Sequence, residues 1–204
     1  MPPQAGSRVP VTLFAGRRGA GKSRTLLALV DRKPADERWT LIVEEIGNTM
    51  PEPGQLAARG VAVRGSPYGC PCCSGNLTMR VSLARAVRET RPQRLLIELP
   101  WGTHLDKARS VFQDPLLARA VALDGLVVVL DEDAGSPQAG QGAQAVSDAP
   151  LQDALRFADA IMLSGIAPSH RLVADVRERY AGKRIVAGLA DPELHRLLDP
   201  HEAG

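Results

Sequence analysis

The sequence has no long apolar segment and no recognisable export signal. No apolar run in its 204 residues approaches the roughly 20 residues that a membrane-spanning helix needs. The first ten residues lack the basic and then apolar order of a signal peptide. These absences predict a chain without a membrane anchor, and we place it in the cytoplasm.

The chain also lacks any block of like charge. It has 25 basic and 23 acidic residues, a formal net charge of +2, with both signs spread along the sequence. Nucleic-acid surfaces require concentrated positive charge, so we expect no nucleic-acid partner.

Cysteine is confined to one short segment, at Cys70, Cys72 and Cys73. This pattern is no disulfide framework, because a bridge between adjacent cysteines is strained. Cysteines without disulfides suit a reducing compartment. Three thiolates are soft ligands that favour zinc or another thiophilic metal, with Glu45, water or a partner's side chain in the fourth position. The alternative is a tight turn of small residues that binds no metal.

The strongest motif that is present runs from Gly16 to Ser23 and reads GRRGAGKS, after an apolar segment and before a helical pattern. Such a loop directs backbone N–H groups and the positive end of a helix at a phosphate. Lys22 would neutralise the β- and γ-phosphate oxygens, and Ser23 would ligate magnesium. A simple glycine turn is the alternative. The residues expected to contact a nucleotide are Gly16, Gly19, Ala20, Gly21, Lys22, Ser23 and Arg24.

Short β-branched or leucine-rich segments alternate with longer helical patterns, which is typical of βα units around a parallel sheet. We therefore predict an α/β fold of the P-loop NTPase type, a three-layer sandwich with a mostly parallel sheet. The expected organisation is a flexible N-terminus (1–8), a nucleotide-binding domain (9–190) with a mobile loop at 132–147, and a C-terminal tail (191–204). Predicted strands cover 9–14, 40–43, 61–63, 94–98, 126–131, 160–163 and 184–187, and predicted helices 23–31, 77–90, 105–122, 151–158, 169–180 and 192–198.

Three further segments read LIVEEIG (41–47), GCPCCSG (69–75) and LIELPWG (96–102). Together with the phosphate-binding loop they make the chain similar to the CobW-like P-loop GTPases, metallochaperones related to HypB and UreG. The resemblance covers about residues 9–163, and its most specific element is the Cys-x-Cys-Cys motif. It implies magnesium-dependent GTP hydrolysis linked to the handling of zinc or another transition metal for a client protein.

The same resemblance assigns roles to two acidic residues. Glu98 would hold magnesium and act in catalysis together with Lys22; capping of a helix is the alternative. Glu45 would position the attacking water or bind zinc, unless it is an ordinary solvated acid. Asp131 and His104 follow strands at the edge where ligands bind, but we expect His104 to be a surface or capping residue.

The chain also departs from the family pattern. Ser164, Gly165 and Ala167 replace the Asn, Lys and Asp of the guanine-reading motif, which predicts weak base selectivity and acceptance of ATP. The segment before Gly102 is one residue longer than the family's. The resemblance further implies a divergent member without the usual C-terminal domain, and a homodimer is a further expectation.

Two functions therefore remain open at the level of sequence. The first is a GTPase or NTPase whose cycle drives metal delivery. The second is a non-hydrolysing accessory or sensor that binds nucleotide and metal with relaxed base specificity.

Overall fold

The computed structural model describes residues 8–44, 53–66, 75–131, 149–167 and 170–198, and the structural statements below concern these ranges. None of the helices in them combines the length and apolar character that a membrane span requires.

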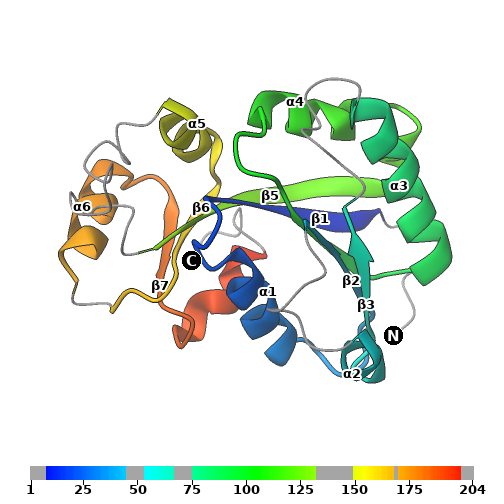
Figure 1. The fold of residues 1–204 in the computed structure, drawn as a ribbon, viewed down its shortest axis with the longest axis horizontal. Helices are drawn as coiled ribbons and strands as arrows, with labels where there is room; N and C mark the ends of the chain where they lie inside the picture. Colours follow the sequence, from blue (N-terminus) through cyan, green and yellow to red (C-terminus); the bar gives the residue numbers. More distant parts are fainter. Residues whose placement is uncertain (1–7, 45–52, 67–74, 132–148, 168–169, 199–204) are drawn as a thin grey trace.

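Seven strands form one sheet in the order β3-β2-β4-β1-β5-β6-β7, with all pairs parallel (Figure 1). The chain builds one half of the sheet first, returns to place β4 beside β1, and then crosses to the other half. Parallel strands end at the same edge, so the carboxyl ends of β1, β4, β5 and β6 lie together there. The strands are β1 (Val9–Ala15), β2 (Trp39–Val43), β3 (Val61–Gly65), β4 (Arg94–Glu98), β5 (Val121–Leu130), β6 (Ala160–Leu163) and β7 (Arg184–Ala187).

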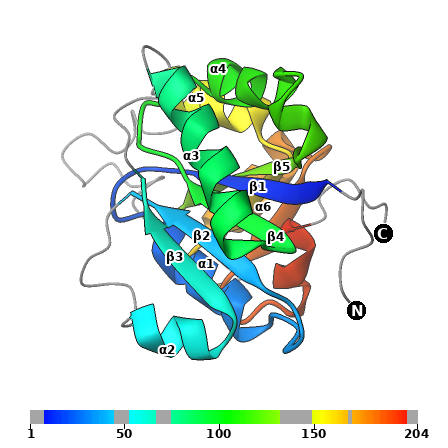
Figure 2. The same cartoon turned by 90° about the vertical axis from the view of Figure 1, so that its right-hand side faces the viewer.

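Helices cover both faces of the sheet, which confirms the predicted three-layer α/β fold. Side chains alternate along β1: Val11 and Leu13 belong to one buried cluster and Phe14 to the other. Figure 2 shows α4 above the strands and α2 below them. One layer contains α1 (Lys22–Asp31), α2 (Pro53–Ala58) and the 3-10 helix η5 (Pro192–Leu197); the other contains α3 (Gly75–Thr90), α4 (Leu105–Ser110), α5 (Ala149–Phe157) and α6 (Arg171–Arg179).

The helix predicted over 105–122 is wrong in its second half. Helix α4 ends at Ser110, and two 3-10 helices follow, η1 (Val111–Gln113) and η2 (Leu117–Arg119). The carboxylate of Asp114 accepts the N–H groups of Leu116 and Leu117 at 3.0 and 3.1 Å, a local turn that competes with helix continuation. Strand β5 then begins earlier than predicted, because Val121 already pairs with Val9 of β1.

The region beyond residue 190, expected to be a tail, contributes to the core. Leu194 and Leu197 are completely buried in the same cluster as α1. Arg32, just after α1, donates hydrogen bonds to the carbonyls of Leu189 and Asp191 at 3.1 and 2.6 Å. The packed chain therefore reaches Leu198. The predicted mobile loop at 132–147 lies outside the described residues.

Candidate nucleotide-binding site

The phosphate-binding loop, residues 16–23, connects the carboxyl end of β1 to the first turn of α1. Gly21 has a φ of +91°, and a Cβ at this position would collide with Oγ of Ser164 and lie 2.9 Å from its Cβ. Ser164 follows β6 and is 4% exposed. The loop therefore packs directly on the end of β6, and only glycine fits at its last turn.

Lys22 is turned into the loop rather than into solvent. Its Nζ donates to the carbonyl oxygens of Gly16 at 3.0 Å and Arg17 at 3.1 Å. The same Nζ lies 3.6 Å from Oε1 of Glu98, and the Lys22 side chain is 4% exposed. The loop thus encloses a buried positive charge at the start of α1, where an anion is favoured.

Glu98 is the last residue of β4 and pairs in register with Phe14 of β1, so the sheet itself brings it beside the loop. Oγ of Ser23 donates a long hydrogen bond of 3.5 Å to Oε2 of Glu98. A hydroxyl and a carboxylate at this distance are the hard oxygen ligands that magnesium prefers. The residues present therefore fit a magnesium ion.

Burial raises the pKa of Glu98 above the usual glutamate value, and the charge of Glu44 adds to the rise. The ammonium group of Lys22 and a hydrogen bond from the backbone of Glu44 oppose it. Glu44 directly follows β2 and is exposed. A cation bound beside this carboxylate would favour its ionised form and so oppose the effect of burial.

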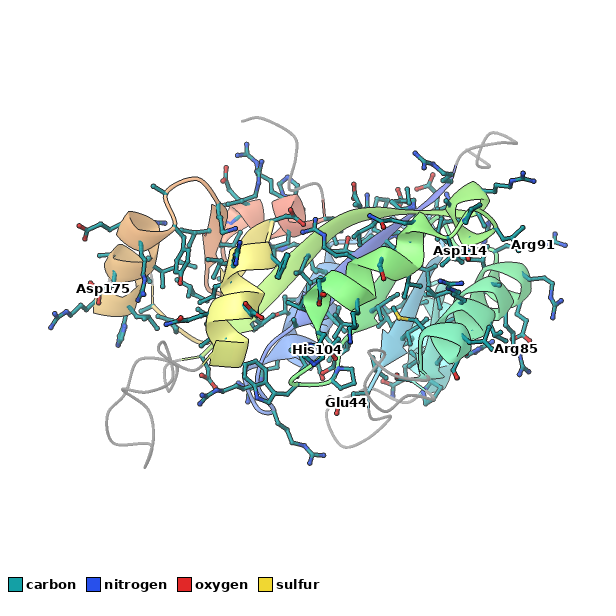
Figure 3. The ribbon with its side chains drawn as sticks, turned by 90° about the horizontal axis from the view of Figure 1, so that it is seen from above. Glu44, Arg85, Arg91, His104, Asp114 and Asp175 are labelled. Carbon is teal, nitrogen blue, oxygen red and sulfur yellow. The ribbon has the colours of Figure 1, made fainter. Side chains whose placement is uncertain are left out.

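A cavity of about 330 Å³ lies beside the loop, between the segment after β4 and α5. His104 is the N-cap residue of α4, makes no capping hydrogen bond with its side chain, and is exposed. Its side chain lies on the same side of the molecule as Glu44 (Figure 3). This exposed N-cap position agrees with the surface or capping role expected for His104, and the residue also lines the cavity. The lining comprises Ala15, Gly16, Pro100, Trp101, Gly102, Thr103, His104, Leu105, Gln152, Asp153 and Ala154.

One contact at the loop, between Arg17 and Trp101, could not be predicted from the sequence. The guanidinium carbon of Arg17 lies 5.7 Å from the centroid of the Trp101 ring, within the range of a cation–π contact. Arg17 follows β1 and Trp101 follows β4, and no local pattern links them.

The structure describes the three positions of the guanine-reading motif, Ser164, Gly165 and Ala167. Their side chains cannot make the contacts of Asn, Lys and Asp. Ser164 is buried against Gly21, while Gly165 and Ala167 are exposed. No carboxylate stands at Ala167 to accept the N–H groups of guanine.

Of the remaining predicted site residues, some lie within the described ranges and others do not. Glu45 and the three cysteines lie outside the described residues; among the residues that are described, no group of three or more His, Cys, Asp or Glu side chains can hold a metal ion. Arg24 is exposed in the first turn of α1, and Asp131 follows β5 at the same sheet edge as the loop. His170 caps α6, since its Nδ1 accepts the N–H of Leu172 at 3.2 Å.

Comparison with known proteins agrees with this geometry. A model of the family described as CobW/HypB/UreG, nucleotide-binding domain, matches residues 10–181. The zinc chaperone YeiR of Escherichia coli (strain K12) is 29% identical over 150 residues, which is 74% of this chain and 44% of YeiR. The chain therefore spans less than half the length of that relative.

Solved structures share the fold. The Zn(II)-bound YjiA GTPase from E. coli matches with a TM-score of 0.59 and 19% identity, over 96% of this chain and 63% of that one. The hydrogenase maturation factor HypB from Archaeoglobus fulgidus matches with a TM-score of 0.60 and 15% identity, over 94% of this chain and 87% of that one.

Proposed function

Because the chain belongs to the CobW/HypB/UreG nucleotide-binding domain family, we propose that it hydrolyses a nucleoside triphosphate, GTP first among them, and couples this to the handling of zinc or another transition metal. The observation that carries the proposal is the convergence of Lys22, Ser23 and Glu98 at one end of the sheet.

In this proposal each residue has a role that follows from its position. The loop amides and Lys22 bind the β- and γ-phosphates and stabilise the charge that develops during transfer. Ser23 and Glu98 would hold magnesium, which neutralises phosphate charge when bound. Water adds to the γ-phosphorus, the bond to the β,γ-bridging oxygen breaks, and the diphosphate leaves with that oxygen while the water's proton goes to the released phosphate.

The metal half of the proposal rests on Cys70, Cys72 and Cys73, whose thiolates suit zinc. The family likeness and the similarity to a zinc chaperone support it. Glu45 lies in the sequence between the phosphate-binding loop and the cysteine segment. We propose that it completes the zinc site or positions the attacking water. Nucleotide state and metal affinity would then influence each other reciprocally, and a client protein would receive the metal.

A second candidate is supported by the base-binding positions. With Gly165 and Ala167 in place of Lys and Asp, these two positions supply no side chain that could enforce a strict GTP requirement. The chain would then bind nucleotide and metal as an accessory or sensor without productive hydrolysis.

Magnesium-dependent phosphate release from GTP and ATP separates the two candidates. The expected result is slow release that the Lys22→Ala substitution abolishes. Lys33→Ala is the matched control, because Lys33 follows α1 and donates to the carbonyls of Pro34 and Glu37 instead of facing the loop. Tight nucleotide binding without release by the unmodified chain would favour the accessory role, and no binding at all would contradict both.

A further inference from the structure

The phosphate-binding loop carries two arginines besides Lys22, and one of them, Arg17, contacts an aromatic ring. Arg17 is half-buried, and its guanidinium carbon lies 5.7 Å from the centroid of the Trp101 ring. Arg17 and Lys22 occupy different places, since Nζ of Lys22 is enclosed by the carbonyls of Gly16 and Arg17 and by Glu98.

Trp101 is itself anchored. Its ring is partly buried and packs against the hydrophobic cluster under α4 and α5. The backbone before α4 is also ordered locally, because Thr103 donates both its N–H, at 3.2 Å, and its hydroxyl, at 2.7 Å, to the carbonyl of Pro100. The Trp101 ring is therefore held in position to contact an arginine side chain.

Contact with an aromatic face restricts the orientation of a guanidinium group. Arginine has five N–H donors in the plane of the group, which match the paired oxygens of a phosphate. Restricting the side chain in advance reduces the entropy lost when it binds a ligand. Trp101 also lines the cavity of about 330 Å³ beside Gly16, so this ring borders open space next to the loop.

We propose that Arg17 binds the terminal phosphate of the bound triphosphate and that Trp101 is the positioning residue that holds its guanidinium for this role. This inference rests on the proposed nucleotide binding. It assigns Arg17 the stabilisation of charge on the γ-phosphoryl oxygens, supplied from within the same chain. It also gives a purpose to the longer segment between Glu98 and Gly102, which contributes the tryptophan.

The test compares Arg17→Ala with Arg18→Ala, an exposed arginine in the same loop. Two quantities are measured with magnesium: the affinities for a non-hydrolysable GTP analogue and for GDP by calorimetry, and the rate of single-turnover phosphate release from GTP. Arg17→Ala should lower the analogue affinity at least tenfold more than the GDP affinity, and should slow release by roughly a hundredfold or more. Arg18→Ala should change neither the ratio of the analogue affinity to the GDP affinity nor the rate of phosphate release.

Trp101 is tested by a pair of variants. Trp101→Leu should reproduce part of the loss in the analogue-to-GDP affinity ratio, and Trp101→Phe, which keeps an aromatic face, should recover most of it. A purely structural role for Trp101 would instead lower both affinities together and follow the thermal stability of each variant.

The outcomes separate this inference from the function on which it rests. If the unmodified chain releases no phosphate but Arg17→Ala still weakens analogue binding selectively, hydrolysis fails and the role of Arg17 stands. If release occurs and Arg17→Ala behaves like Arg18→Ala, the proposed function stands and this inference is wrong. Absence of nucleotide binding by the unmodified chain overturns both.

Discussion

The carboxylate of Glu98 lies 3.6 Å from Nζ of Lys22, and the two side chains are only 8% and 4% exposed. The pair joins the end of β4 to the first residue of α1. Glu98 also accepts the hydroxyl of Ser23, so one buried carboxylate serves both residues of the loop that the proposal gives to phosphate and magnesium.

Glu98 should make stability depend on pH when magnesium and nucleotide are absent. Because its pKa is raised in the folded chain, the folded state holds the proton more tightly than the unfolded state. This contribution to stability is present below the usual glutamate pKa of about 4.3 and is lost as the pH rises through the folded pKa. The free energy of unfolding of the unmodified chain, compared with Glu98→Gln, should therefore fall over that window in urea titrations. A constant difference between the two proteins would contradict the assignment.

Gly21 should be far less tolerant of substitution than Gly19. Both have positive φ, +91° and +88°, but a Cβ at Gly21 would collide with Ser164, whereas nothing lies within 4 Å of one at Gly19. Gly19→Ala should cost about 1 to 2 kcal/mol from the backbone alone. Gly21→Ala should cost roughly 1 to 3 kcal/mol more, from steric overlap. Urea unfolding measures both, and equal losses would show that the loop can move away from β6.

Asp159 should be important for stability although it is far from the nucleotide site. It accepts Nη2 of Arg109 at 3.0 Å and the N–H of Leu126 at 2.8 Å, and its side chain is 15% exposed. Asp159→Ala leaves both donors without this acceptor and should cost about 2 to 3 kcal/mol. Asp175→Ala is the control, because that side chain is 59% exposed and 3.7 Å from Arg171. The control should cost less than about 0.5 kcal/mol in the same unfolding assay.

Metal content should depend on the cysteines. Freshly purified chain should contain zinc or another transition metal that is lost in the Cys72→Ser, Cys73→Ser double variant, since hydroxyls are poor ligands for soft metals. Elemental analysis at matched protein concentration measures this, with Ser74→Ala as the neighbouring control. Equal metal content in all three proteins would exclude the cysteine site.

Base preference should be weak and should be open to engineering at Ala167. Because this position lacks a carboxylate, GTP and ATP should bind with magnesium within about tenfold of each other. Ala167→Asp should raise the preference for GTP, while Ala167→Asn, of similar size, should raise it less. Calorimetric titration compares the nucleotides, and strong GTP selectivity in the unmodified chain would mean that other residues read the base.

Much of the site follows from the sequence because its determinants are local. The loop from Gly16 to Ser23 needs only a strand, a glycine-rich turn and a helix, which are consecutive in the chain. Strand β4 was predicted with its observed bounds, 94–98, so Glu98 was expected at a strand end. The parallel arrangement then follows from the alternation of strands and helices.

Other features depend on contacts between distant segments, which no periodic pattern contains. The helix expected over 105–122 ends at Ser110, because Asp114 forms a local turn and Val121 pairs with Val9 in the sheet. The contact between Arg17 and Trp101 exists only because β1 and β4 are neighbours in the sheet. The sequence by itself therefore determined the loop to which we assign phosphate binding, because that loop depends on local backbone geometry. Only the tertiary structure decided which side chains share the loop with them, because strand order and packing bring those residues together.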